Sequence, residues 1–169
     1  MSRNAAPVAF ALTTVAAVAA VIVAALVLPE RVPTHFGATG DADDWSSRAG
    51  AVTFLALLTA GMAGMFAAFA RGSARMSMEW VNVPHKQRWI EAGLEAELRR
   101  RLREDLLLFG AGTNVLVLST TLAVIQAARS GADALPWWWV TVFALWLVAT
   151  IAHAVFMQRV RYRLERVVR

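Results

Sequence analysis

Four long uncharged stretches divide the chain. They span about residues 7–28, 49–70, 106–128 and 135–157, and none of them contains Asp, Glu, Lys or Arg. Each has roughly the 20 apolar residues that a helix needs to cross a hydrocarbon core about 30 Å thick. Because lipid cannot satisfy exposed backbone groups, we expect each stretch to be helical. The pattern predicts an all-α membrane protein, a four-transmembrane-helix bundle.

The composition agrees with this prediction. Hydrophobic residues make up 58% of the chain and charged residues 17%, against about 45–50% and about 25% in soluble domains. The first stretch exceeds the apolar part of a cleaved signal peptide, about 7–15 residues, so we expect it to be retained. The chain has no cysteine, which excludes disulfides and catalysis by a thiol.

The basic residues predict the orientation. Fourteen of the 17 Lys and Arg residues lie before the first stretch, between the second and third, or after the fourth. Basic residues accumulate on the cytoplasmic side, so both termini should be cytoplasmic and the loop 29–48 should lie outside. The short connection 129–134 makes residues 106–169 a transmembrane hairpin with a basic cytoplasmic tail. We therefore expect a multi-pass protein of the cell membrane. Because the net charge of +5 comes from basic residues that flank the apolar stretches, we expect no nucleic acid partner.

Small residues predict where the helices meet. Two ridges repeat every four residues, a spacing that lets helix backbones approach closely in lipid. They are Ala16, Ala20 and Ala24 in the first stretch, and Ala56, Ala60, Gly64 and Ala68 in the second. We expect Asn114 and His153 to form a hydrogen bond between the third and fourth stretches, with a proton relay as the sharper alternative. Trp137, Trp138 and Trp139 should anchor the fourth stretch at the outer interface.

The segment 90–105 is amphipathic. Ile90, Leu94, Leu98 and Leu102 recur every four residues. The segment should form a helix that either lies on the membrane surface or extends the third stretch into the cytoplasm. Its basic cluster, Arg99, Arg100, Arg101 and Arg103, either binds anionic headgroups or only fixes the topology.

The outer loop carries the candidate chemistry. Asp43, Asp44 or Ser46 can cap the second helix. His35, Asp41 and Asp43 are candidate ligands of a divalent cation, but their spacing matches no strong metal motif, so we predict no metal and no cofactor. As residues that contact a partner we expect His35, Asp41, Asp43, Trp45 and, in the cytoplasmic loop, Lys86.

The same loop resembles a known family. LPERVPTHFGATGDADDW, from Leu28 to Trp45, resembles the loop after the first helix in a bacterial domain of unknown function shared with SdpI-type toxin-immunity proteins, and NVPHKQRW resembles that family's second landmark. The matched positions are Leu28, Pro29, Pro33, His35, Phe36, Gly40, Asp41 and Trp45, then Asn82, Pro84, Lys86 and Trp89. The resemblance covers roughly the first hundred residues and implies a domain over residues 1–105.

What the resemblance implies is a sensor or immunity-type membrane protein that responds to a secreted peptide toxin or envelope signal. In the sensing version, a cytoplasmic regulator is held at the membrane. The alternative is a transport or permeation protein for small solutes or ions. Because the sequence has no HExxH, no GxSxG and no membrane-embedded Asp pair, we expect no enzyme. The lipid bilayer is the one partner that the pattern itself requires.

The predicted orientation can be tested with a reporter fused after Arg169. Because the arginines should keep both termini inside, a reporter that is active only in the cytoplasm should be active, and one that is active only outside should be silent. The opposite pair of results would reverse the orientation and every side assigned to a loop.

Overall fold

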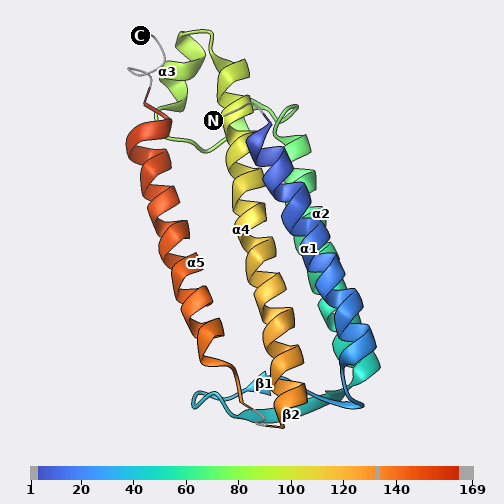
Figure 1. Cartoon of the computed structure of the whole chain (residues 1–169). Helices are drawn as coiled ribbons and strands as arrows, with labels where there is room; N and C mark the ends of the chain where they lie inside the picture. Colours follow the sequence, from blue (N-terminus) through green and yellow to red (C-terminus); the bar gives the residue numbers. More distant parts are fainter. Residues whose placement is uncertain (1–3, 132–133, 164–169) are drawn as a thin grey trace.

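The computed structural model describes residues 4–131 and 134–163. Four long helices run side by side along the molecule (Figure 1): α1 (Ala5–Val27), α2 (Arg48–Gly72), α4 (Glu95–Ser130) and α5 (Trp137–Phe156). All four are long and apolar enough to cross a membrane, α5 together with the π-helical turn η2 (Met157–Arg161). The predicted four-helix membrane bundle is therefore confirmed. The cytoplasmic position of the termini stays a prediction.

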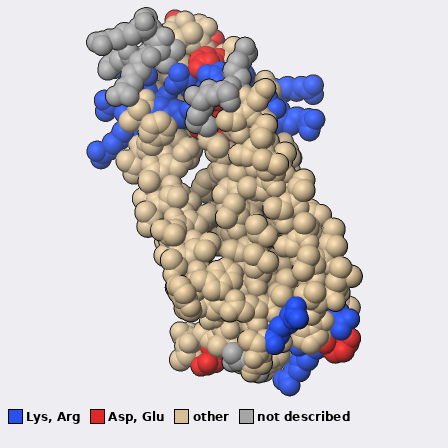
Figure 2. Space-filling view, viewed as in Figure 1, with Lys and Arg blue, Asp and Glu red and all other residues tan. Residues whose placement is uncertain are grey.

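The two ends of the bundle differ in structure and charge. One end carries a β-hairpin, and we call it the hairpin end. The opposite end carries most of the arginines, and we call it the arginine end. Figure 2 shows charged side chains at both ends and a long uncharged band between them. This distribution is the one expected of a bundle whose middle lies in hydrocarbon.

The loop after α1 forms two strands that the sequence analysis did not predict. β1 (Arg31–Phe36) pairs with β2 (Ala42–Ser47) in an antiparallel hairpin. Gly40 lies in the turn with φ +87°, a backbone conformation that glycine adopts without strain. Val32 is fully buried, so β1 packs onto the helix ends. The backbone N–H of Leu135 donates to the carbonyl of Gly40 at 2.8 Å, and the hairpin thereby also holds the connection between α4 and α5.

The hairpin runs directly into α2. Ser47 ends β2 and caps α2, because its side chain accepts a hydrogen bond from the backbone N–H of Gly50 at 3.1 Å. The prediction that Asp43, Asp44 or Ser46 would cap this helix is wrong. All three lie within β2, and the strand continues to Ser47, which occupies the position directly before the first turn.

Small residues bring α1 close to α4. Ala17 and Ala24 of α1 have no exposed surface, and Ala20 is buried beside them. These residues lie on the face of α1 that packs on its neighbours, most extensively on α4. The predicted ridge on the first helix is thus confirmed at Ala20 and Ala24, with Ala16 half-buried at its edge.

The predicted ridge on the second helix is wrong. All four of its members, Ala56, Ala60, Gly64 and Ala68, are exposed. The opposite face of α2 packs on α4 instead, and the small residue in that interface belongs to α4. A Cβ at Gly110 would lie 2.8 Å from the Cβ of Phe66 and 2.8 Å from the ring of Phe10. Gly110 therefore forms a notch that leaves room for both phenylalanines, and this contact determines which face of α2 packs on α4.

The amphipathic segment is divided between two helices. Residues Lys86–Glu91 form the short helix α3, Gly93 follows with φ +67°, and the chain then continues as α4. The 36 residues of α4 span about 54 Å at 1.5 Å per residue, against about 30 Å of hydrocarbon. Of the two alternatives, extension of the third transmembrane helix is the correct one. Leu98 is fully buried in a small core with Trp89, not in the membrane surface.

The fourth transmembrane helix stands apart from the other three. No residue of α5 is buried, and its helix–helix contact is with α4. Figure 2 shows openings between this helix and the rest of the bundle. Three helices therefore form a packed core, and α5 flanks it.

Substitution of Gly110 tests the packed core. We expect Gly110→Ala to destabilise the bundle by about 1–3 kcal/mol, because the added methyl group forces α4 away from Phe66. Thermal unfolding in detergent measures the change. Gly112→Ala is the matched control, since the nearest atoms to its Cβ would lie 3.7 Å away. Equal stability of the two variants would contradict the notch.

Candidate functional site

The hairpin brings two of the predicted site residues together. His35 Nδ1 lies 2.5 Å from a carboxylate oxygen of Asp43, across the two strands. Both side chains are exposed, at 67% and 56%. Asp41 is not part of this pair, and its carboxylate accepts a hydrogen bond from the Thr39 hydroxyl at 2.8 Å. In residues 4–131 and 134–163, no three His, Asp or Glu side chains lie close enough to hold a metal ion.

The other two predicted residues have local partners. The guanidinium of Arg31 lies over the Trp45 ring, 4.4 Å from its centroid, which is a cation–π contact across the hairpin. Lys86 lies at the arginine end, where its ammonium donates to the carbonyl of Met78 at 3.0 Å. That contact ties α3 to the preceding 3-10 turn η1 (Met78–Trp80). The five predicted residues therefore do not form one surface.

The histidine–aspartate pair has an electrostatic consequence. The hydrogen bond to Asp43, together with the negative charge of that residue, raises the pKa of His35 above its ordinary value. Such a histidine keeps its charge to a higher pH than a free imidazole does. The rim of the hairpin end thus carries a titratable ion pair.

An apolar cavity lies beneath the hairpin. Its volume is about 280 Å³, and its walls come from β1, α2, α4 and the start of α5. The lining residues are Pro33, Thr34, His35, Phe36, Ala51, Phe54, Leu55, Thr120, Val124, Leu135 and Trp139. Sequence reasoning named Pro33, His35 and Phe36 of this wall through the loop motif, and Trp139 only as an interface anchor. The rest comes from residues far apart in the chain, and no local pattern marks them.

Two tryptophans fasten the start of α5 beside this cavity. The indole N–H of Trp139 donates to the Thr120 hydroxyl at 3.0 Å, and that of Trp138 to the side-chain oxygen of Gln126 at 2.8 Å. Trp137 is 80% exposed and does not line the cavity. The tryptophan run thus attaches α5 to α4, in addition to its predicted placement at the interface.

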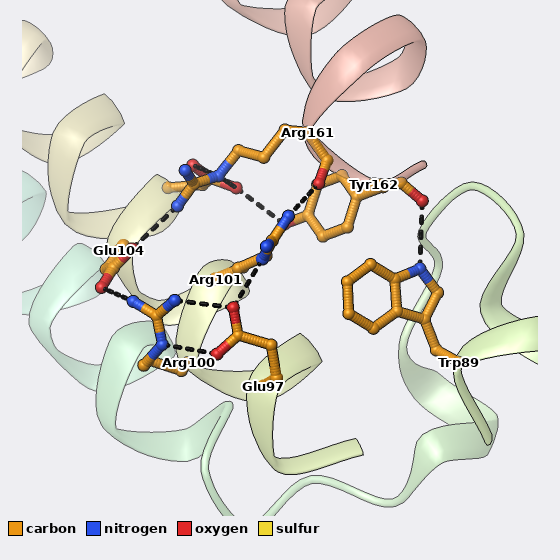
Figure 3. A network of polar contacts seen from close by, with 8 residues as sticks. Trp89, Glu97, Arg100, Arg101, Glu104, Arg161 and Tyr162 are labelled. Atoms are coloured by element: carbon orange, nitrogen blue, oxygen red, sulfur yellow. Dashed lines mark hydrogen bonds and ion pairs between the residues drawn. The ribbon is translucent and has the colours of Figure 1, made fainter. Parts of the chain in front are cut away.

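A buried ionic cluster holds the other end of α5 (Figure 3). Asp105 of α4 is 3% exposed and accepts hydrogen bonds from Arg161 at 2.9 Å and from the Tyr162 hydroxyl at 2.7 Å. Glu104 accepts a further bond from Arg161 at 2.9 Å. The indole N–H of Trp89 donates to the Tyr162 carbonyl at 3.0 Å. Sequence reasoning missed this cluster because Asp105 and Arg161 are 56 residues apart.

The predicted basic cluster is largely used inside the protein. Arg99 donates to carbonyl oxygens in the loop after α2. Arg100 pairs with Glu97 at 2.7 Å and also with Glu104, while Arg101 pairs with Glu97 at 2.8 Å. Three of the four arginines therefore have partners inside the protein, a role that neither of the two alternatives included. They hold the cap at the arginine end together.

The predicted hydrogen bond between Asn114 and His153 is wrong. The Asn114 amide donates to the Thr14 hydroxyl of α1 at 2.8 Å, because Asn114 lies on the face of α4 that packs against α1. His153 Nε2 lies 3.7 Å from Asp105, in a hollow between α4 and α5.

Comparison with known proteins adds a partial match. Residues 12–60 match the family model of a domain of unknown function, DUF1648. The DUF1648 segment comprises most of α1, the whole hairpin and the first half of α2. It contains the first landmark, and the second, Asn82 to Trp89, lies outside the matched residues. The predicted domain over residues 1–105 stays a prediction. No curated protein and no solved structure matches the chain.

The DUF1648 segment therefore contributes the hairpin and two of the cavity walls. The other walls, from α4 and α5, lie outside it. The helices α4 and α5, which follow later in the chain, therefore complete the cavity on the side away from the DUF1648 segment.

Substitution of Asp43 tests the ion pair. In Asp43→Asn the pKa of His35 should fall toward its ordinary value of 6.5, whereas Asp41→Asn should leave it unchanged. NMR titration of the imidazole measures both. Because the folded-state pKa is raised, the pair stabilises the hairpin below about pH 6.5, and this contribution is lost as the pH rises through the folded-state pKa. An identical His35 pKa in Asp43→Asn and in the natural chain would contradict the pairing.

Proposed function

We propose that this chain is a membrane receptor, of the sensor or immunity type, whose cavity beneath the hairpin binds an apolar segment of a secreted peptide. The observation that carries the proposal is the cavity itself. It joins the motif residues of the hairpin to Trp139 of α5, the one transmembrane helix that buries no side chain.

The walls of the cavity define the class of ligand. Most of the wall is aliphatic or aromatic, as in sites that take apolar groups and orient them through a few polar contacts. The exposed carboxylates of Asp41, Asp43 and Asp44 lie on the same hairpin whose strand β1 lines the cavity. This arrangement favours a peptide with a hydrophobic segment and basic flanks. Charge complementarity would speed its encounter with the hairpin.

The attachment of α5 supports a route for the response. Among the described residues, polar contacts at its two ends and the aromatic contact between Phe109 and Trp146 join α5 to α4. A ligand beside Trp139 would press on the hairpin end of this helix. Since α5 lacks a buried interface that resists movement, the displacement would reach Arg161 and Tyr162, which continue from its far end. A cytoplasmic regulator would then sense the altered arginine end.

Filling the cavity tests the receptor. We expect Val124→Phe to lower protection against the peptide fraction of spent medium by about tenfold or more, since overpacking costs about 1–3 kcal/mol and competes with the ligand. Survival of cells that express each variant measures the effect. Leu122→Phe is the matched control, because Leu122 lies on the same helix but is 44% exposed.

Two outcomes would contradict the receptor. One is full protection by Val124→Phe at natural expression. The other is solute or ion flux in proteoliposomes that His153→Ala abolishes, which would favour the permeation alternative. The observation behind that alternative is His153, which lies beside the buried Asp105 and whose Nε2 has no hydrogen-bond partner among the described residues.

A further inference from the structure

We propose a specific site for one anionic phospholipid at the arginine end, formed by Arg71 of α2 and Arg103 of α4. This site does not depend on the receptor function, because it lies at the opposite end of the molecule from the cavity beneath the hairpin.

Arg71 and Arg103 differ from the other three arginines of the basic cluster. Arg99, Arg100 and Arg101 all have carboxylate or carbonyl partners. Neither Arg71 nor Arg103 has an ion pair or hydrogen bond within the described part of the chain, and both side chains are exposed. Their positive charge is thus left for a partner outside the protein.

The arginines border a hollow between α2 and α4. Its volume is about 300 Å³, and Ala67, Ala70, Ala74 and Leu107 complete its wall. The alanines leave space that longer side chains would fill. The result is a groove with an apolar floor and two cations at its edge. A phospholipid has the complementary form, an anionic phosphate above an acyl chain.

The height of the groove fits a headgroup. Ala70 and Leu107 pack in one cluster, so they lie at the same level of the bundle. Arg71 directly follows Ala70 and ends the uncharged stretch of α2, while Arg103 lies one turn before Leu107. Both guanidinium groups therefore lie where the apolar band ends, the depth at which phosphates are found.

A neighbouring hollow explains why the anion would select this pair. Arg103 also borders a hollow of about 460 Å³ on the α1 side, together with Arg100 and Glu104. There the Glu104 carboxylate already pairs with Arg100 and would repel a phosphate. On the Arg71 side, no carboxylate of the described residues lines the wall. The electrostatic potential is thus more favourable for a phosphate in the groove between α2 and α4 than in the hollow on the α1 side.

Native mass spectrometry of the full chain tests the site, with palmitoyl-oleoyl phosphatidylglycerol and the matching phosphatidylcholine as probes. The natural chain should retain one phosphatidylglycerol in preference to phosphatidylcholine. Arg71→Gln with Arg103→Gln should weaken this binding about 25-fold, at about fivefold for each arginine. The charge-matched control is Arg75→Gln with Arg88→Gln, two exposed arginines of the same end that do not line the groove.

Two further results test the site. Ala67→Phe, which fills the groove without a change of charge, should also weaken phosphatidylglycerol binding. Inorganic phosphate at the same concentration should not displace the lipid. Equal loss in the control pair, or unchanged binding in Ala67→Phe, would overturn the site and leave only diffuse attraction. Thermal unfolding in phosphatidylcholine identifies any variant that fails to fold.

Discussion

Close contact between helix backbones is the constraint on which this bundle depends. Within lipid, burial of apolar surface does not drive helices together, so association depends on packing and on polar contacts. The alanine face of α1 and the Gly110 notch of α4 provide that packing for three helices. α5 has no such face. It is held instead by tryptophan hydrogen bonds at one end and the Asp105 cluster at the other.

This difference divides the molecule into a rigid part and an attached part. The rigid part comprises α1, α2 and α4, with the hairpin lying on its end. The attached part is α5 with the residues on either side of it. It meets the hairpin at Leu135 and Trp139 and meets α4 again through Arg161. The cavity lies where the two parts join. The DUF1648 segment contributes its share of this junction from the rigid side, and the helix that completes the wall comes from the far half of the chain.

Much of the architecture follows from the sequence, because the bilayer imposes one simple rule on each helix. Uncharged stretches of sufficient length had to be helices, and all four are. The face that each helix turns toward its neighbours was harder to predict. The ridge from Ala56 to Ala68 has the spacing of a packing surface, but it is exposed. Phe66, on the opposite face of α2, packs against Gly110 instead. The hairpin escaped prediction because its strands are stabilised by contacts with helix ends, not by their own alternation. At the site, His35 and Asp43 were expected, whereas Asp105 needed a partner 56 residues away that no spacing reveals.

The looseness of α5 also has a consequence for how the chain can change over evolutionary time. A helix that buries no side chain places few demands on the residues along its middle. Apart from Trp146, whose ring contacts Phe109 of α4, most apolar replacements there exchange one lipid-facing surface for another. Its two ends are different, since the indoles near Trp139 and the guanidinium of Arg161 have fixed geometries. Sequence drift should therefore be tolerated in the centre of this helix and restricted at both extremities, the reverse of a helix buried along its whole length.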